Sequence, residues 1–366
     1  MRVMVLGVRG IPEVQGGVET HAEQLYPRLK RLGCEIEVVV RSPFVPPSQR
    51  EFDSIPLRRI WCPRQPGLEA FVHSVLGVIY AGFAHPDILH VHAIGPSIIT
   101  PIARLFGLRV VVTHHGPDYD RAKWGPFARW VLRTGERWGM RYAHARIAVS
   151  NVIAELISSK HRVAAVVIPN GALAVDQERG TKHIEALGLQ PGRYFLQVSR
   201  VVPEKRQLDL IAAFLKAQVP DWKLVLVGGL DSTAYSGEVR AAAGAAGAVL
   251  TGFLTGAPLR EIYSHAGGFV LPSAHEGLPI AILEALSYGL PVVASAIPAN
   301  LEVGLPATSY FPLGDVGALS ERLQALVFAR NDESERAARR AFVTDTYDWD
   351  RIAGQTLAVY QAVMAR

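Results

Sequence analysis

Residues 275–293 read HEGLPIAILEALSYGLPVV, an almost wholly apolar run that holds two glutamates, Glu276 and Glu284. Pro279 suits the first turn of a helix and Gly289 suits its end, so the run predicts a helix. The strand pattern GGFVLPS precedes this helix and LPVVAS follows it. A helix between two β-branched strands is typical of a parallel α/β sheet. Glu284 then lies one to two turns inside the helix, where an unpaired carboxylate is costly and a partner is required.

The same alternation of strand and helix runs through the whole chain. Its strand patterns are VMVLGV, EIEVVVR, DILHVHA, LRVVVTHHG and ARIAVS in the first half, and YFLQVSRV, WKLVLVGG, AVLTGFL, GGFVLPS and LPVVAS in the second. This alternation predicts an α/β protein of two doubly wound, Rossmann-like domains facing a central cleft. We place the N-terminal domain at residues 1–172, the C-terminal domain at 173–348 and a last helix at 349–366.

Length and composition agree with two ordinary globular cores. The chain has 366 residues, of which 49% are hydrophobic and 19% charged, and such a length favours more than one domain. Its longest apolar stretch, FVHSVLGVIYAGF, is shorter than the roughly 20 residues that a membrane-spanning helix needs. Cys34 and Cys62 have neither metal-binding nor disulfide-framework spacing, so we predict a reducing, cytoplasmic location.

Positive charge is concentrated in the first half. Residues 1–178 hold 21 of the 38 Lys+Arg residues and 15 of the 33 Asp+Glu residues, so their net charge is about +6. The remaining residues have a net charge of about −1, and the sum is the net +5 of the chain. An anionic partner of the first half is one interpretation, and a merely soluble surface is the other.

Several predicted strands end in glycine or in polar residues, and ligands of doubly wound sheets bind beyond those ends. These residues are Gly16 and Gly17, His92, His114 and His115, Arg200 and Lys205, and Glu276. Together they predict one ligand cleft, although a single histidine at a strand end is as often structural, and His92 is open between the two.

The first turn ends in Gly16 and Gly17 and lacks the GxGxxG pattern of dinucleotide-binding dehydrogenases. Backbone amides at a helix start without side chains can bind phosphate or sugar, but the glycines can also merely permit a tight turn. Two cations at one strand end, Arg200 and Lys205, can neutralise a diphosphate leaving group. The alternative is that both lie on a solvated loop.

Sugars give the two carboxylates of the opening stretch a function. An ionised carboxylate accepts two hydrogen bonds from a vicinal diol such as ribose, which suits Glu284. Glu276, before the helix, suits the hydroxyls of a second sugar, while the helix start faces phosphate. The alternative is a helix-capping Glu276 and a salt-bridged Glu284.

These motifs together resemble the GT-B glycosyltransferases of family 4. SRVVPEKR is similar to the basic segment of that family, and HEGLPIAILEALSYGLPVVAS to its E-x7-E segment. GVRGIPEVQGGVE and THHGPD also resemble family features. The resemblance runs nearly from end to end, and it implies that the last helix crosses back onto the first domain.

The resemblance also implies roles for individual residues. Arg200 and Lys205 would bind the donor diphosphate, Glu284 the nucleotide ribose and Glu276 the donor sugar, with Glu276, His115, Arg200 and Lys205 as the catalytic set. The backbone of Gly277, Leu278 and Pro279 would contact the donor, and Gly16 and Gly17 would lie near donor phosphate and acceptor. The donor is then a nucleotide diphosphate sugar, the acceptor a hydroxyl of a glycan or lipid-linked molecule, and the product of retained configuration belongs to cell-surface polysaccharide or glycoconjugate synthesis.

Some alternatives stay open. His115 is preferred over His114 as the imidazole that faces the cleft. DYD at 118–120 and DWD at 348–350 are similar to a metal-binding DxD motif, but we assign no metal and no cofactor besides the donor. A nucleotide-sugar epimerase or phosphorylase of the same double-Rossmann fold is the rival function, and the E-x7-E placement disfavours it.

One arginine pattern concerns the acceptor side. Arg129, Arg133, Arg137 and Arg141 recur at four-residue spacing among tryptophans and, in a helix, would form one stripe. A cationic stripe with tryptophans suits an anionic membrane surface, so we predict possible peripheral contact with the inner face of the membrane. The alternative is an ordinary solvated face, and no nucleic-acid-binding motif accompanies the charge.

Overall fold

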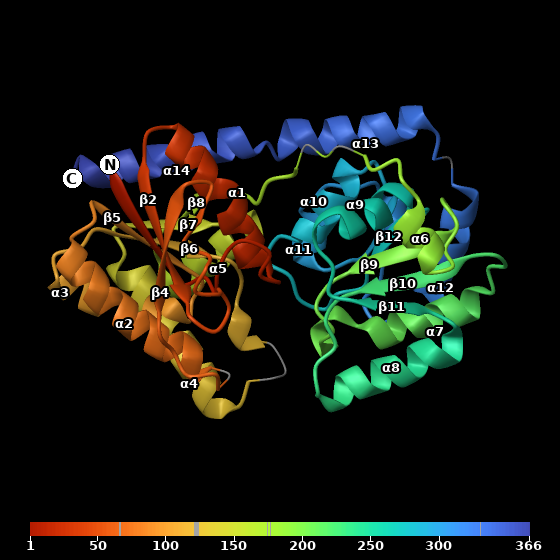
Figure 1. Ribbon diagram of the computed structural model, residues 1–366, viewed down its shortest axis with the longest axis horizontal. Helices are drawn as coiled ribbons and strands as arrows, with labels where there is room; N and C mark the ends of the chain where they lie inside the picture. Colours follow the sequence, from red (N-terminus) through yellow and green to blue (C-terminus); the bar gives the residue numbers. More distant parts are fainter. Residues whose placement is uncertain (66, 121–123, 174, 176, 330) are drawn as a thin grey trace. The chain divides into compact units, whose positions relative to one another are not determined.

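A computed structural model describes residues 1–65, 67–120, 124–173, 175, 177–329 and 331–366 (Figure 1). The chain divides into two compact units, one of Met1–Gly171 with Trp349–Arg366, the other of Ala172–Asp348. Each unit is described by itself below.

The first unit is built on a sheet in the order β3-β4-β2-β1-β5-β6-β7-β8. The strands are β1 (Arg2–Leu6), β2 (Glu35–Arg41), β3 (Glu51–Phe52), β4 (Ile55–Ile60), β5 (Ile88–His92), β6 (Val110–His114), β7 (Ala145–Ala148) and β8 (Val166–Val167). All pairs are parallel except β3 with β4. β2 pairs with one side of β1 and β5 pairs with the other side. The carboxyl ends of β1 and β5 therefore form the switch point, where such sheets bind ligands.

Helices flank this sheet in the chain order of a doubly wound fold (Figure 1). They are α1 (Gly17–Arg31), α2 (Leu68–Ala84), η1 (Pro96–Ile99), α3 (Thr100–Leu105), η2 (Asp118–Asp120), α4 (Pro126–Tyr142), α5 (Asn151–His161) and α14 (Trp349–Met364). The last helix, α14, packs against α1. A Cβ at Gly171 would lie 2.4 Å from the ring of Trp349, so the chain at this position accepts only glycine beside that buried tryptophan.

The second unit has an all-parallel sheet in the order β11-β10-β9-β12-β13-β14. The strands are β9 (Tyr194–Val198), β10 (Lys223–Val227), β11 (Val249–Gly252), β12 (Gly268–Leu271), β13 (Val292–Ser295) and β14 (Tyr310–Phe311). Numbered along the chain this order is 3-2-1-4-5-6, the Rossmann arrangement, and its switch point lies between β9 and β12.

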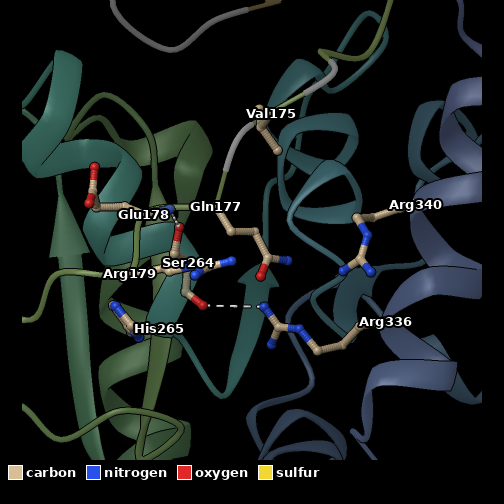
Figure 2. Close-up of a pocket in the computed structure, with 8 residues that line it drawn as sticks. All are labelled: Val175, Gln177, Glu178, Arg179, Ser264, His265, Arg336 and Arg340. Atoms are coloured by element: carbon tan, nitrogen blue, oxygen red, sulfur yellow. Dashed lines mark hydrogen bonds between the residues drawn. The ribbon is translucent and has the colours of Figure 1, made fainter.

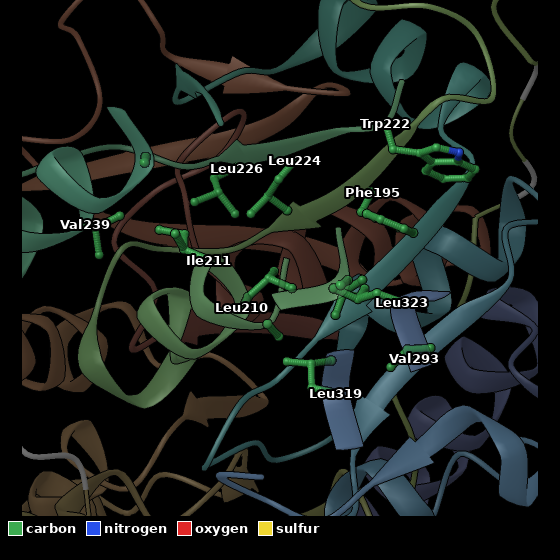
Figure 3. Packing of buried hydrophobic residues seen from close by; sticks show 14 of the residues in the cluster. Phe195, Leu210, Ile211, Trp222, Leu224, Leu226, Val239, Val293, Leu319 and Leu323 are labelled. Carbon is green, nitrogen blue, oxygen red and sulfur yellow. The ribbon is translucent and has the colours of Figure 1, made fainter. Parts of the chain in front are cut away.

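Apolar side chains of the second unit gather under its helices (Figure 3). The helices are α6 (Lys182–Ala186), η3 (Pro203–Lys205), α7 (Gln207–Ala217), α8 (Ala234–Ala246), α9 (Gly256–His265), α10 (Ile280–Ser287), α11 (Pro298–Leu301), η4 (Ala307–Ser309), α12 (Val316–Phe328) and α13 (Glu333–Thr346). Trp222 stacks on Phe195 with ring centroids 4.6 Å apart, and Leu210 and Leu319 of α7 and α12 are fully buried beside them. This core holds the β9 and β12 ends in place.

The prediction of two doubly wound, Rossmann-like domains is confirmed, and each strand pattern quoted from the sequence corresponds to a strand. The helix of the opening stretch begins at Ile280, so Pro279 is the residue before the helix rather than part of its first turn. Strands β3, β4, β8 and β14 were not predicted. IPLRRI of β4 mixes apolar and charged residues, and the other three strands have only two residues each. No described helix has the length and apolar character to cross a membrane.

Candidate functional site

The loops that follow β9 and β12 bring a lysine and a glutamate together at the switch point of the second unit. Lys205 Nζ forms an ion pair with Glu276 Oε1, and both side chains are largely buried. Two backbone-directed bonds hold the loops: Gln197 Nε2 donates to the carbonyl of Lys205 at 3.0 Å, and the Ala274 amide donates to the carbonyl of Glu204 at 2.8 Å. The structure thus joins two residues that are 71 positions apart in the sequence.

Arg200 lies on the same loop after β9. Its Nη2 lies 3.9 Å from Glu204 Oε1, and its carbonyl accepts a hydrogen bond from Gln207 Nε2 at 2.9 Å. The guanidinium keeps about a quarter of its side-chain surface, 24%, exposed. Arg200 and Lys205 therefore supply two cations at one strand end, in a loop that Gln207 of α7 ties down.

Glu284 lies inside α10 and has a hydroxyl as its partner. Tyr263 donates its hydroxyl to Glu284 Oε2 at 3.0 Å, and the ring of Tyr263 stacks on Tyr288 with centroids 4.9 Å apart. Burial raises the pKa of Glu284 to about 7, although the hydrogen bond from Tyr263 acts to lower it. A carboxyl held this way titrates near neutral pH and gains from any further hydrogen-bond donor that stabilises its charge.

The segment between the two glutamates approaches α10 without a side-chain cap. Leu278 and Pro279 are buried, Gly277 is partly exposed, and Pro279 occupies the position before the helix. Pro279 itself contributes no side-chain hydrogen bond to the start of the helix. The unpaired amides at the start of a helix are anion-binding groups in general.

In the first unit, Gly16 and Gly17 begin α1 beside a carboxylate. A Cβ at Gly16 would lie 2.1 Å from Glu19 Oε2, so this approach requires glycine. Glu19 is buried and accepts hydrogen bonds from the backbone amide and Nε of Arg9 at 3.1 and 3.2 Å. The helix start that the sequence marks as an anion site therefore already has an acidic group near it.

The histidine pair at the end of β6, His114 and His115, is divided between the interior and the surface. His114 is fully buried, bonded to Glu136 Oε1 at 3.1 Å, while His115 is partly exposed. His92 is fully buried at the end of β5, and its Nδ1 lies 2.9 Å from His115 Nε2. Burial lowers the pKa of His92 and of His115 well below the ordinary value, and the neighbouring histidines lower each pKa further. Both imidazoles are therefore neutral at physiological pH.

Sequence reasoning missed the residues that surround this pair. His21, one turn into α1, packs its ring 5.0 Å from that of His115 and 5.4 Å from that of His92. Its Nδ1 bonds Asn170 Oδ1 at 2.9 Å, and Tyr26 bonds His92 Nε2. Burial lowers the pKa of His21 to about 4, against the opposite effect of Asn170. His21 sits within an amphipathic helix pattern and Asn170 lies 149 residues away, so no local signal linked them.

The arginine stripe on α4 is exposed. Arg129, Arg133, Arg137 and Arg141 all lie on the open face of the helix, with Phe127 and Trp130 exposed by 76% and 60%. Glu136 does not interrupt the stripe, since it is fully buried and pairs with Lys160 and His114. Burial acts to raise the pKa of Glu136, but its bonds with His114 and Lys160 bring it down to about 2.

A separate cavity of about 580 Å³ lies in the second unit between the end of α9 and α13 (Figure 2). Arg336 and Arg340 of α13 face it, together with Ser264 and His265. Arg336 Nη2 donates to the carbonyls of Ser264 and Tyr288 at 3.2 and 2.9 Å, so it neutralises the ends of α9 and α10. The cavity lies at the end of α9 that leads into β12, away from the strand ends that carry Lys205 and Glu276.

Two family models match the chain in succession. The model described as Glycosyltransferase Family 4 matches residues 15–172, and that described as Glycosyl transferases group 1 matches residues 181–343. The two matches together cover most of both units.

Curated relatives and solved structures agree with the family models. The chain is 26% identical to the GDP-mannose-dependent alpha-mannosyltransferase of Mycolicibacterium smegmatis, over 100% of this chain and 98% of the relative. It is 27% identical to the GDP-mannose:cellobiosyl-diphosphopolyprenol alpha-mannosyltransferase of Komagataeibacter xylinus, over 92% and 87%. Sucrose-phosphate synthase from Thermosynechococcus elongatus has a similar structure, with a TM-score of 0.83, 22% identity and coverage of 100% and 99%.

Proposed function

Because this chain belongs to the GT-B glycosyltransferases of family 4, we propose that it moves a hexosyl group from a nucleoside diphosphate sugar to an acceptor hydroxyl with retention of anomeric configuration. The observation that carries the donor site is the pairing of Lys205 with Glu276 at the switch point of the second sheet. When the donor binds, Lys205 can pair with the diphosphate in place of Glu276, and Glu276 can then bind the sugar.

Donor binding begins with that exchange. A diphosphate carries more negative charge than one carboxylate, so it replaces Glu276 as the partner of Lys205, and Arg200 adds a second cation from the same loop. Glu276, released from Lys205, accepts hydrogen bonds from hydroxyls of the donor sugar. The backbone amides of Gly277 and Leu278 and the start of α10 lie beside the same loop and favour the phosphates.

Glu284 recognises the ribose. Its carboxyl already accepts the Tyr263 hydroxyl through Oε2. A vicinal diol that donates to the carboxylate stabilises the ionised form, so binding of the nucleotide lowers the pKa from about 7. The site therefore releases part of a proton when the nucleotide binds near neutral pH.

The acceptor side belongs to the first unit. His115 is partly exposed at the carboxyl end of β6, and Gly16 and Gly17 open α1 at the switch point. A neutral imidazole can donate or accept a hydrogen bond at a sugar hydroxyl without adding charge. In the proposed same-face reaction the leaving phosphate oxygen takes the proton of the acceptor hydroxyl as the new glycosidic bond forms, and Arg200 and Lys205 stabilise the diphosphate that departs.

GDP-mannose is the first donor to test, because two relatives that align with most of this chain are described as using GDP-mannose. One of them is described as acting on a diphosphopolyprenol-linked acceptor. We extend that class of acceptor, a lipid-linked glycan, to this chain, with cell-surface polysaccharide or glycoconjugate as the product and the cytoplasm as the compartment.

Peripheral membrane contact through α4 fits such an acceptor. The exposed arginines of α4 are accompanied by exposed apolar side chains on α4, α2 and α3, and α3 packs against each of the other two helices. Phe83 of α2 and Leu105 of α3 are exposed by 82% and 87%. Basic and apolar side chains on one set of neighbouring helices are the combination that binds an anionic bilayer surface.

The test is transfer itself. The protein is incubated with GDP-mannose, UDP-glucose or ADP-glucose and a polyprenyl-diphosphate-linked disaccharide in detergent, and release of nucleoside diphosphate is followed with the anomeric NMR signal of the product. We expect release with one donor only when acceptor is present, and an axial linkage from an α-linked donor. Conversion of a nucleotide sugar into its epimer without release of nucleotide, or a product of inverted configuration, would contradict the proposal.

A further inference from the structure

Three imidazoles from distant parts of the first unit converge at the carboxyl ends of its central strands. One ring nitrogen from each of His21, His92 and His115 lies within 4.8 Å of the others. His21 comes from the second turn of α1, His92 from the end of β5 and His115 from the residue after β6. None of the three rings is in the same element as another, so the fold, rather than a local motif, gathers them.

The outer nitrogens of two of these rings are already fixed by buried oxygen atoms. Asn170 Oδ1 lies 2.9 Å from His21 Nδ1, and the Tyr26 hydroxyl bonds His92 Nε2. Metal-ligating histidines characteristically use one nitrogen for the ion while a carbonyl, carboxylate or other polar group orients the second nitrogen. His21 Nε2 and His92 Nδ1 are then the nitrogens that remain for a ligand.

The inner nitrogens meet at a short distance. His92 Nδ1 and His115 Nε2 are 2.9 Å apart, which is a hydrogen bond with one shared proton. Two nitrogens bound to one tetrahedral zinc ion at about 2.0–2.1 Å lie about 3.4 Å apart, so the two rings need to separate by only about half an ångström. The shared proton moves to the outer nitrogen of its own ring, which leaves both inner lone pairs for the ion and conserves the number of protons.

Burial also suits an ion that keeps an open coordination position. His21 and His92 are buried, while His115 is partly exposed and offers a path to solvent. Three imidazoles with one position left for water or an oxygen ligand is the donor set of open zinc sites. Among the described residues no carboxylate or cysteine joins this group, so imidazole nitrogen alone sets its preference, which favours zinc and its neighbours over magnesium or calcium.

From this geometry we propose that His21, His92 and His115 form a binding site for one divalent transition-metal ion of the zinc type, with Asn170 and Tyr26 orienting the ligands. No spacing in the sequence pointed to it, and the sequence reading assigned no metal. The site shares His115 with the proposed acceptor side and no residue with the donor site in the second unit, so metal binding is measured separately, without a sugar substrate.

Cobalt is the probe, because Co²⁺ in a four- or five-coordinate nitrogen site absorbs visible light much more strongly than the octahedral aqueous ion. Full-length protein without a polyhistidine tag is stripped with chelator, dialysed and titrated with CoCl₂. We expect visible bands that saturate at one equivalent per chain and are bleached by one equivalent of Zn²⁺.

Variants connect the bands to these residues. His115→Ala, at the partly exposed position, should abolish the bands, and Asn170→Ala should weaken Co²⁺ binding by about 10- to 100-fold because it releases His21. His85→Asn is the matched control, since His85 is exposed at the left-handed end of α2, where asparagine is tolerated. Circular dichroism establishes that each variant is folded.

The Co²⁺ titrations distinguish a metal site from its absence. Saturable bands that His115→Ala removes and His85→Asn keeps support the site. Weak absorption of octahedral type in the wild-type protein overturns the proposal, and so do equal Co²⁺ affinities of the wild type and the folded His115→Ala or Asn170→Ala protein. Neither result depends on whether the protein transfers a sugar.

Discussion

Replacement of Glu284 by glutamine should make the ligand-free protein more stable at neutral and alkaline pH. Glu284 is held inside α10, and burial raises its pKa from 4.5 to about 7. In the unfolded chain the same carboxyl ionises near its ordinary value. Between these two pKa values the folded protein binds one more proton than the unfolded chain, so this group lowers the free energy of unfolding as pH rises.

The size of the effect follows from the shift. A difference of 2.5 between 4.5 and about 7 corresponds to about 3 kcal/mol at 1.36 kcal/mol for each pKa unit. The cost is small near pH 5 and complete above pH 7. Glutamine keeps an acceptor for the Tyr263 hydroxyl but carries no charge, so the stability difference between Glu284→Gln and wild type should widen by about 2–3 kcal/mol between pH 5 and pH 8.

The assay needs a signal from the second unit alone. Trp222 is the one tryptophan between residues 172 and 348, so the ¹⁹F signal of fluorotryptophan at this position reports the unfolding of that unit. Urea unfolding at pH 5, 6, 7 and 8 then gives the stability of wild type, of Glu284→Gln and of Glu238→Gln, which removes an exposed carboxylate from α8. A difference that does not change with pH, or a Glu284→Gln protein less stable than wild type at pH 8, would refute the reasoning.

Three further predictions concern the rate of sugar transfer, the stability of the core of the second unit and binding to a membrane surface. Glu276→Gln should leave binding of nucleoside diphosphate at least as tight, since its lysine partner is freed, but lower transfer on the order of 100-fold; equal rates in the two proteins would contradict its role. Phe195→Ala should cost about 3–5 kcal/mol in urea unfolding of the second unit, followed by the Trp222 signal, because it empties a packed core position, and a loss below about 1 kcal/mol would be inconsistent. Reversal of two charges in Arg133→Glu, Arg137→Glu should weaken binding to phosphatidylserine vesicles by roughly 30-fold or more at about 1 kcal/mol for each arginine, whereas Arg240→Glu, exposed on α8, should not. Equal sedimentation of both variants with the vesicles would exclude α4 as the contact.

The sequence was sufficient for ten of the fourteen described strands, because most of these ten are buried on both faces and form continuous β-branched runs. Examples of such continuous apolar runs are VVV in β2, VVV in β6 and FVL in β12. β4 was not predicted, because Arg58 and Arg59 interrupt its apolar residues. The start of α10 was misplaced by one residue, since Pro279 fits both the first helical position and the one before it.

For the site, topology explains what could be foreseen. Lys205 and Glu276 follow strands that are neighbours at a switch point, so their proximity follows once the strand order is known. Partners that depend on side-chain packing could not be foreseen. Tyr263 on α9 reaches Glu284, and Asn170 reaches His21, through contacts that no periodicity encodes.

The most direct test of the account is calorimetric titration of the protein with GDP, UDP and ADP. We predict that one of the three nucleotides binds with one site per chain and that Glu284→Gln weakens this binding by tenfold or more. Wild type, but not Glu284→Gln, should release protons on binding near pH 7. Binding of none of them at millimolar concentration, or equal affinity in the two proteins, would contradict the claim that this carboxylate recognises a nucleotide ribose.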